Sequence, residues 1–278
     1  MVKIITDTTS CLPDNIQHQY QISLIPQLIH IGEKTYLEGV DIDNRLFMEL
    51  LQSSDELPKT AAPPPEYFKT IFKNQAGIEE PLLCIHPSSD LSGTVRSAET
   101  ARLDFPDLDI RIIDTRLIAS PLGTLVHQAA IWSTQTDDPD DLVHQINSLA
   151  GRGKIFFLVK TLEFLSRGGR IGAASALLGN ALQIKPILSL KDGQVIPHLK
   201  ERTFSKAIDR LKTLVLEEYP SGQEGFLTIM HAGNSELATD LSQFFQEKIK
   251  LPPPLIHDLP PAIITHAGPG SIAVGFFS

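Results

Sequence analysis

The stretch Pro81–Arg96 constrains the fold of this chain most strongly, because it joins an apolar run to a helical pattern through a hydroxyl-rich loop. Leu82–His86 has turn residues on both sides and predicts a buried strand. Val95–Leu103 has helical spacing, and Ser92 or Thr94 is expected to cap this helix. Free amides and the positive end of a helix meet at such a junction, which can stabilise a carboxylate or a phosphate. A capped helix without any ligand is the simpler interpretation.

The first half of the chain repeats this alternation of strand and helix. Val2–Thr6 and Ile110–Ile113 are further apolar runs, and each of them ends in a polar turn. Alternating strands and helices predict an α/β fold with a parallel, doubly wound, Rossmann-like sheet. Open sheets of this kind place their ligands at the carboxyl ends of the strands, where the hydroxyl-rich loops of this chain fall.

Three local patterns in this half give sharper expectations. The runs Ile22–Ile31 and Lys34–Leu37 flank Gly32-Glu33 and suggest a hairpin. Lys59–Pro65 is expected to lack regular structure, because proline has no amide hydrogen and restricts the residue before it. Cys84 lies inside the apolar run and is expected in the core.

The pattern changes after about residue 153. Lys154–Lys160 predicts a strand and Ala173–Leu182 a helix of small residues, whereas Ile184–Leu190 and Gln194–Leu199 flank a hairpin turn. These elements predict a second, α+β domain with a mixed sheet. We therefore expect domains at residues 1–153 and 154–278.

Composition excludes some classes of partner. The chain has 24 Lys and Arg against 33 Asp and Glu, a net charge of −9, which argues against nucleic acid or an anionic membrane as the main partner. Only two cysteines occur, Cys11 and Cys84, so a disulfide framework is not expected and the cytoplasm is the default location. The N-terminus lacks a signal-peptide pattern, and no apolar run approaches the roughly 18 residues of a membrane helix. We expect a soluble protein.

Familiar catalytic motifs are absent from the sequence. It contains no phosphate-binding P-loop, no H-E-x-x-H, no C-x-x-C and no G-x-S-x-G, and Gly168–Gly172 does not fit G-x-G-x-x-G. The nine histidines show no metal-ligand spacing, so no metal site is expected. An enzyme acting on a small carboxylated or phosphorylated substrate remains the alternative to a binding protein, and it would need a polar pocket with a base. A lipid carrier would instead need an apolar tunnel. Small and apolar residues after Gly172 favour such a tunnel, although they could also be ordinary core residues. They are Ala173, Ala174, Leu177, Leu178 and Leu182.

Several short segments, in order along the whole chain, together resemble the DegV family of bacterial fatty-acid-binding proteins. They are Thr6–Thr9, Glu38–Asp41, Lys59-Thr60, Ser88–Thr94, Ile113–Thr115, Arg167–Gly172, Lys185–Ile187, Arg202-Thr203 and His266–Ser271. The resemblance implies two α/β domains with a lipid between them. It also implies a non-catalytic subunit without a cofactor, which holds a long-chain fatty acid such as palmitate or a C18 acid. A separate ATP-dependent fatty acid kinase would phosphorylate the carboxylate, and transient membrane contact without insertion fits this role.

The resemblance also implies roles for individual residues. Thr60, Ser92 and His266 match the residues that hold the carboxylate, with Ala61, Gly93 and Thr94 in the supporting loops, and Arg170 and Arg202 match residues that meet the kinase. Two hydroxyls and an imidazole can satisfy the hydrogen bonds of a buried carboxylate without a salt bridge. A salt bridge to an arginine would hold the carboxylate more strongly and would hinder phosphoryl transfer.

One departure and several alternatives accompany these assignments. The family loop usually reads Thr-Ser-Gln-Pro, whereas this chain has Thr60-Ala61-Ala62-Pro63 and lacks two polar side chains. Taken alone, Thr60 is a turn residue and His266 a structural histidine. Arg170 is expected at a loop edge with its guanidinium free, although pairing within the turn is the alternative. Arg202 could be a solvated residue before a helix.

Overall fold

The computed structural model describes residues 2–54, 56–74, 80–221, 225–250 and 252–278, and it describes the side chains of these residues except at 179–183. The chain divides into two compact units, Met1–Gly151 and Arg152–Ser278, and each is described here by itself. Among the described residues, no helix combines the length and the apolar character that a membrane crossing requires.

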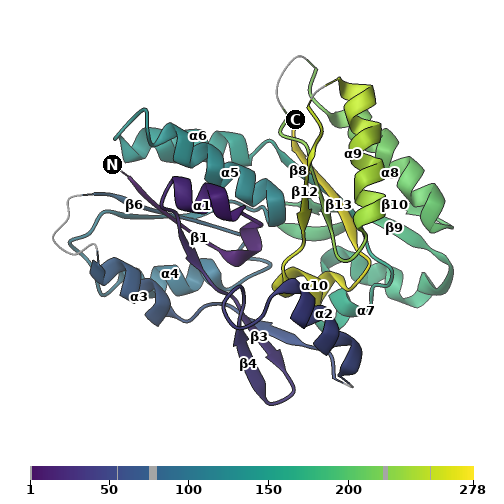
Figure 1. The fold of residues 1–278 in the computed structure, drawn as a ribbon, viewed down its shortest axis with the longest axis horizontal. Coiled ribbons are helices and arrows are strands. Elements are labelled where there is room, and N and C mark those ends of the chain that lie inside the picture. Colours follow the sequence, from purple (N-terminus) through teal and green to yellow (C-terminus); the bar gives the residue numbers. More distant parts are fainter. Residues whose placement is uncertain (1, 55, 75–79, 222–224, 251) are drawn as a thin grey trace. The chain divides into compact units, whose positions relative to one another are not determined.

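The first unit is built on a four-stranded sheet in the order β2-β1-β6-β7, and every neighbouring pair is parallel. The strands are β1 (Lys3–Asp7), β2 (Ser23–Ile25), β6 (Leu82–His86) and β7 (Ile110–Asp114). Helices α3 (Pro65–Asn74) and α4 (Thr94–Arg102) cover one face, and α5 (Ala119–Trp132) and α6 (Pro139–Ala150) lie on the other (Figure 1). The expected doubly wound parallel sheet is confirmed.

A continuous apolar run explains why β6, at the centre of this sheet, is buried on both faces. All five residues of β6 are buried, and Cys84 at its centre packs with Ile5, Phe68 and Ala98 in one cluster. The thiol is fully enclosed, so burial raises the pKa of Cys84 well above its usual range. Cys84 is therefore a core residue, as the sequence predicted.

A second, three-stranded antiparallel sheet in this unit has the order β4-β3-β5. Its strands are β3 (Leu28–Ile31), β4 (Lys34–Leu37) and β5 (Lys59–Ala61), and β3 and β4 form the expected hairpin. The run from residue 22 to 31 is not continuous: it breaks around Pro26 into β2 and β3, which belong to different sheets. The expectation that Lys59–Pro65 is irregular was wrong for its first three residues, because the prolines begin only at Pro63, after β5 has paired with β3.

Short elements join successive strands within each of these two sheets. They are the 3₁₀ turn η1 (Thr8–Ser10) and the helices α1 (Asp14–Gln19) and α2 (Asn44–Ser53). Asp43 caps α2, since its carboxylate accepts a 2.7 Å hydrogen bond from the amide of Leu46.

The second unit contains a six-stranded mixed sheet in the order β10-β9-β8-β13-β11-β12, as expected for an α+β domain. Only β11 and β12 pair in parallel. The strands are β8 (Gly153–Leu158), β9 (Lys185–Lys191), β10 (Gln194–Glu201), β11 (Thr228–His231), β12 (Leu255–Asp258) and β13 (Ile272–Phe277). Helices α8 (Phe204–Glu218) and α9 (Ser235–Ile249) pack on one face of this sheet around Phe156, Leu211 and Phe245.

The remaining elements of this unit are the short helices α7 (Glu163–Arg167) and α10 (Pro261–Ala267) and the segment η2 (Gly172–Gln183). The expected helix of small residues is present as η2, but it is a 3₁₀ helix rather than an α-helix. It begins at Gly172, whose φ of +53° and close approach to the carbonyl oxygen of Val195 both favour glycine.

Candidate functional site

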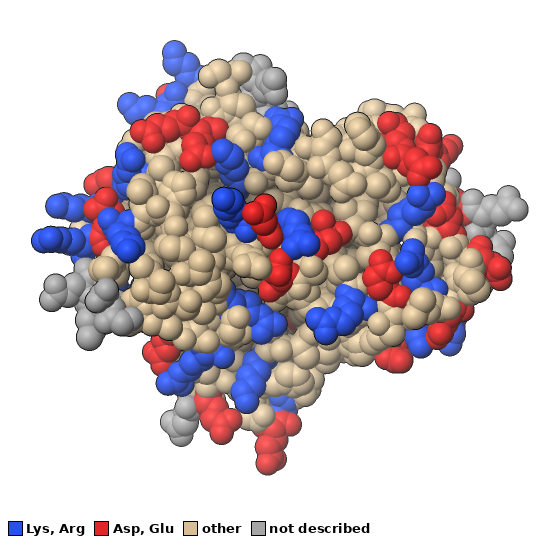
Figure 2. Space-filling model, turned by 180° about the vertical axis from the view of Figure 1, so that it is seen from behind, with Lys and Arg blue, Asp and Glu red and all other residues tan. Residues whose placement is uncertain are grey.

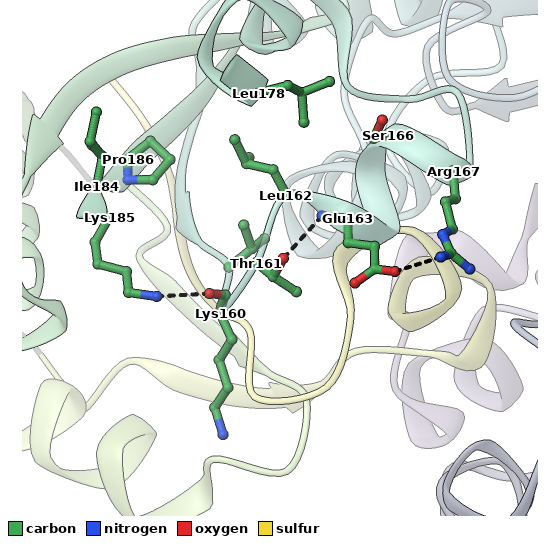
Figure 3. A pocket seen from close by; sticks show the side chains of 11 residues that line it. Lys160, Thr161, Leu162, Glu163, Ser166, Arg167, Leu178, Ile184, Lys185 and Pro186 are labelled. Carbon is green, nitrogen blue, oxygen red and sulfur yellow. Dashed lines mark hydrogen bonds and ion pairs between the residues drawn. The ribbon is translucent and has the colours of Figure 1, made fainter. Parts of the chain in front are cut away.

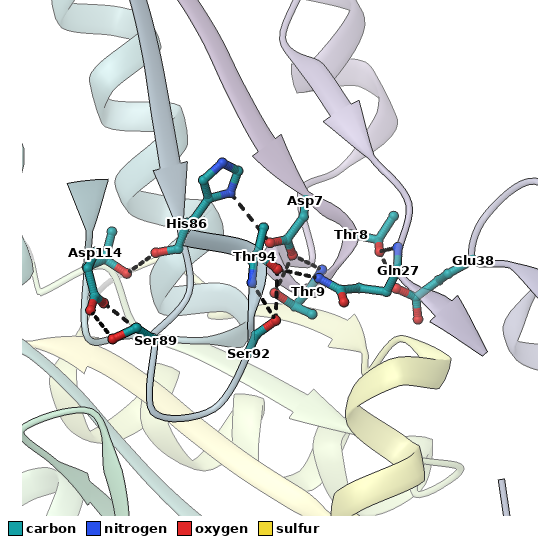
Figure 4. A network of polar contacts seen from close by, with 11 residues as sticks. Asp7, Thr8, Thr9, Gln27, Glu38, His86, Ser89, Ser92, Thr94 and Asp114 are labelled. Atoms are coloured by element: carbon teal, nitrogen blue, oxygen red, sulfur yellow. Dashed lines mark hydrogen bonds and ion pairs between the residues drawn. The ribbon is translucent and has the colours of Figure 1, made fainter. Parts of the chain in front are cut away.

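A network of hydroxyl groups forms at the carboxyl end of β6, in the loop that the sequence singled out (Figure 4). The hydroxyls of Ser92 and Thr94 lie 2.8 Å apart, and the amide of Thr94 also donates to Ser92 Oγ at 3.4 Å. Gln27 donates from Nε2 to Thr94 Oγ1 at 3.0 Å. Gln27 and Thr94 are buried, whereas Ser92 is half-buried. A buried polar chain therefore ends at a hydroxyl that keeps some access to solvent.

The expected cap of α4 differs from the structure. Gly93 occupies the N-cap position, and no side chain accepts a capping hydrogen bond there. The hydroxyls of Ser92 and Thr94 bond to each other instead. Ser92 contacts the helix end through the 3.4 Å hydrogen bond that its oxygen accepts from the amide of Thr94, the first residue of α4.

Thr60 lies at the centre of β5, where it pairs with Ile29 of β3. The segment that follows Thr60 reaches the Ser92 loop, since a Cβ on Gly93 would lie 3.3 Å from Cβ of Ala62. The first unit therefore brings the Thr60 strand and the Ser92 loop into contact. Ala61, like Thr60, is half-buried.

The opposite edge of this loop is fixed by acidic residues. Ser89 donates from Oγ to the carboxylate of Asp114 at 2.6 Å, and Arg116 bonds Asp90 at 2.5 Å and Asp114 at 3.1 Å. Asp114 ends β7, so the loop is tied to the neighbouring strand (Figure 4).

Sequence reasoning gave no role to a buried carboxylate–imidazole pair beneath this loop. Asp7 Oδ2 and His86 Nδ1 are 3.5 Å apart, and both side chains are completely buried. The other oxygen of Asp7 accepts from the amide of Thr9 at 2.9 Å, and the His86 ring packs edge-on against Phe68. Asp7 ends β1 and His86 ends the adjacent β6. Two polar residues at the ends of neighbouring buried strands are the signal that could have found the pair.

In the second unit, His266 lies on α10 against the segment after α7. A Cβ placed on Gly168 would be 2.1 Å from His266 Nδ1, so only glycine leaves room for the ring. Burial and the nearby charge of Arg170 lower the pKa of His266 to about 4. The imidazole is therefore neutral at neutral pH and can offer a hydrogen bond but no full charge.

Arg170 is half-buried and donates from Nη1 to the carbonyl of Gly168 at 2.7 Å. The expectation of a free guanidinium at a loop edge was wrong, because the chain turns back at Gly169, with φ of +70°, and leads the side chain to that carbonyl. Arg202, in contrast, is exposed between β10 and α8.

The turn after α10 requires glycines for two reasons. Gly268 has φ of +81°, and a Cβ there would also lie 2.6 Å from the ring of Phe164. Gly270 has φ of +78° and approaches the side chain of Lys160. Ser271 closes the turn by donating to the carbonyls of Ala267 and Gly268 at 2.8 and 2.7 Å. This turn holds His266 against α7.

A pocket of about 540 Å³ opens within the second unit beside α7 and β9 (Figure 3). Its lining combines apolar and charged residues, namely Val159, Lys160, Thr161, Leu162, Glu163, Ser166, Arg167, Leu178, Ile184, Lys185 and Pro186. The charges are partly matched, since Arg167 pairs with Glu163 at 2.9 Å and Lys185 donates to the Lys160 carbonyl. Its volume is within the range of small-molecule sites.

The residues suggested for an apolar tunnel divide into different environments. Ala174 and Leu177 are buried in the core, Leu178 lines the pocket and is 44% exposed, and Ala173 is exposed. The side chain of Leu182 lies outside the described residues.

Surface charge and clusters of metal-ligating side chains bear on two other kinds of site, one for nucleic acid and one for a metal ion. On the face drawn in Figure 2, basic side chains are interspersed with acidic ones, unlike the basic stripe of nucleic-acid-binding proteins. Across the described residues, no group of three or more His, Cys, Asp or Glu side chains could hold a metal ion.

The structure thus assembles two separate sets of expected residues. Thr60, Ala61, Ser92, Gly93 and Thr94 meet in the first unit, joined by the unforeseen Gln27. His266 and Arg170 meet at Gly168 in the second unit, whereas Arg202 lies at another connection of that unit.

The chain is similar to known proteins along its whole length. A curated DegV domain-containing protein of Streptomyces coelicolor is 32% identical over 276 residues, covering 98% of this chain and 97% of the relative. A crystal structure described as a fatty acid binding DegV family protein from Streptococcus agalactiae superposes with a TM-score of 0.92 at 29% identity, covering 100% of this chain and 98% of the other. The Bacillus subtilis structure, described as DegV, a fatty acid binding protein, gives 0.92 at 28% identity, with 100% and 99% covered. The family model described as "Uncharacterised protein, DegV family" matches residues 1–278, and the chain belongs to the DegV family.

Proposed function

We propose that this protein binds a long-chain fatty acid and presents its carboxylate to a separate ATP-dependent fatty acid kinase, which forms the acyl phosphate. The observation that carries the proposal is the buried chain of hydroxyls that ends at the half-buried Ser92. The relatives from Streptococcus agalactiae and Bacillus subtilis, both described as fatty acid binding, support it.

The carboxylate would be held by neutral groups. Ser92 and Thr60 would donate from their hydroxyls, and His266, whose pKa is lowered to about 4, would add an uncharged imidazole. Neutral donors satisfy a carboxylate without the strong bidentate pairing of an arginine. A carboxylate oxygen held in this way stays nucleophilic enough to attack the terminal phosphate of ATP on the kinase.

The replacement of Ser-Gln by Ala61-Ala62 removes two polar side chains near this head group. The close approach of Ala62 to Gly93 supports a packing role for the small side chain in place of a polar contact. Under this proposal, the Gln27–Thr94–Ser92 chain supplies the polar support that the loop itself lacks.

The acyl tail would contribute most of the binding free energy, at about 0.8 kcal/mol per buried methylene. Leu162, Leu178 and Ile184 in the pocket of the second unit offer apolar surface of the kind a tail requires. The protein itself would supply no catalytic group, and Arg170 and Arg202 would contact the kinase. A kinase that uses ATP would work in the cytoplasm, and a chain with two cysteines, Cys11 and Cys84, fits that location.

A displacement assay tests the proposal. Purified protein stripped of lipid is loaded with a fluorescent fatty acid and titrated with palmitate, with the methyl ester of palmitate, and with a short acid such as butyrate. We expect palmitate to displace the probe, the ester to compete much less well, and butyrate to have no effect. Displacement by butyrate but not by palmitate would favour an enzyme of small carboxylates and would contradict the proposal.

A further inference from the structure

The hydroxyl of Ser92 is the end of a hydrogen-bond chain whose direction is set by an amide. The chain begins at Gln27 Nε2, which can only donate, and passes through Thr94 Oγ1 to Ser92 Oγ, over distances of 3.0 and 2.8 Å. Gln27 is 3% exposed and Thr94 is fully buried, so water does not compete for these bonds.

The direction of the second bond follows from the first. Thr94 Oγ1 accepts from Gln27, and its own proton needs an acceptor because the residue is completely buried. Within the described part of the chain, Ser92 Oγ is the acceptor that the structure offers to this proton. The opposite direction would leave the Thr94 proton buried and unused, which costs more than a hydrogen bond contributes.

The state of Ser92 follows in turn. Its oxygen accepts from the hydroxyl of Thr94 and from the amide of Thr94, at 2.8 and 3.4 Å, so both lone pairs are engaged. The hydroxyl proton of Ser92 therefore points away from Thr94 and can be donated to a ligand. A serine in this state donates to an anion, and its oxygen no longer accepts well from a ligand that itself donates.

The backbone of Gln27 is held on both sides. Its amide donates to Thr8 Oγ1 at 3.1 Å, and its carbonyl accepts from the amide of Glu38 at 3.0 Å. The hydroxyl of Thr8 in turn donates to the carboxylate of Glu38 (Figure 4). Gln27 therefore starts the chain from a fixed position between β2 and β3.

We propose that Gln27 is a positioning residue that makes Ser92 an obligate hydrogen-bond donor, and that this polarity makes the site selective for an anionic, acceptor-only head group over one that donates. The inference rests on the proposed function, because it takes Ser92 to contact the head group. It adds a specificity-determining residue that does not itself touch the ligand.

Two substitutions of Gln27 test the direction of the chain. In Gln27→Glu, an ionised carboxylate can only accept, so Thr94 must donate to it and Ser92 must turn its proton toward Thr94. In Gln27→Met, the donor is lost without any added charge. We expect Gln27→Glu to weaken palmitate binding at pH 8 by about tenfold or more and Gln27→Met to weaken it by a smaller factor. Gln52→Glu on the exposed face of α2 is the matched control for the added charge.

Two further readouts separate positioning from general damage to the fold. Binding of hexadecanol should change little in all variants, because its hydroxyl can accept from Ser92 or donate to it and so can pair with Ser92 in either orientation. Lowering the pH from 8 to 6 should restore palmitate binding to Gln27→Glu alone, because burial raises the pKa of a glutamate and the protonated acid can donate to Thr94 again.

The outcomes are distinct. Selective loss of palmitate binding in both variants, with recovery of Gln27→Glu at low pH, supports the inference. Wild-type affinity in both variants, or a parallel loss of palmitate and hexadecanol binding, overturns it while leaving fatty acid binding intact. Wild-type protein that binds neither ligand overturns the proposed function, and the inference falls with it.

Discussion

The imidazole of His266 packs directly on the α-carbon of Gly168, where a Cβ would come within 2.1 Å of Nδ1. The φ of Gly168 is −75°, a conformation open to any residue, so the histidine ring and not the backbone excludes a side chain. The position of His266 therefore depends on a residue from a different part of the chain.

Gly168→Ala is expected to displace the His266 ring and to weaken fatty acid binding by about tenfold, the loss of roughly one hydrogen bond. Displacement titration with palmitate measures the effect. Gly151→Ala is the control, because Gly151 has φ of −61° and its nearest contact would be an ordinary 3.5 Å. Equal affinities of Gly168→Ala and wild type would show that the ring position does not matter for binding.

The pKa of His266 gives a prediction about pH. Burial and Arg170 lower it to about 4, so an NMR titration of the ligand-free protein should find its midpoint far below the ordinary 6.5. Arg170→Ala should raise the midpoint, because a nearby positive charge is removed. A midpoint close to 6.5 in the wild type would contradict the account.

The same shift affects stability. Between pH 6.5 and about 4 the unfolded chain binds a proton on His266 that the folded protein does not bind. His266 should therefore reduce the free energy of unfolding as the pH falls through this window, and its effect should level off below it. Denaturant titrations at several pH values in this range give the free energy of unfolding of the wild type and of His266→Gln. The contribution of His266 is the difference between the two slopes of that free energy against pH.

The hydroxyls that we propose to bind the head group, those of Ser92 and Thr60, can be removed one at a time. Ser92→Ala should weaken palmitate binding by about 1–3 kcal/mol, since it removes one of the donors proposed for the carboxylate, and Thr60→Ala should act in the same direction. Thr70→Ala, which removes an exposed hydroxyl from α3, is the control. Unchanged affinity in the double variant of Ser92 and Thr60 would eliminate both residues as carboxylate ligands.

Arg170→Ala and Arg202→Ala should differ in their effects on fatty acid binding and on acyl-phosphate formation by the kinase. Arg202 is exposed, so Arg202→Ala should retain fatty acid binding but slow acyl-phosphate formation by the kinase at limiting protein. The difference from wild type should shrink as salt increases, because screening removes the attraction that the arginine provides. Arg170 also holds the Gly168 carbonyl, so Arg170→Ala should affect binding as well. Arg210→Ala on α8 is the charge-matched control. Wild-type rates for both variants would place the contact with the kinase elsewhere.

The sequence could predict those elements whose cause is local. The strand Leu82–His86 and the hairpin around Asp192-Gly193 follow from apolar runs and turn residues, and both are confirmed. Periodicity could not reveal that Lys59–Ala61 would join a sheet, because an edge strand of three residues depends on the partner it finds in β3.

The site was harder to predict than the fold, because its supporting contacts join distant residues. Gln27 and Thr94 are 67 positions apart, and Asp7 meets His86 only through the pairing of β1 with β6. Without strand order and register, the sequence does not show that Gln27 meets Thr94, or that the strands ending in Asp7 and His86 are neighbours. The resemblance to a family pointed to Ser92, Thr60 and His266, but not to the amide that orients Ser92 or the glycine that admits the His266 ring.

The most direct test of the central claim is mass spectrometry of the lipid extracted from protein purified without added fatty acid. We expect a fatty acid of about 16 to 18 carbons in near-equal ratio to the protein, because each buried methylene of the tail contributes about 0.8 kcal/mol. Protein that carries no fatty acid after purification, and takes up none when palmitate is supplied, would contradict it.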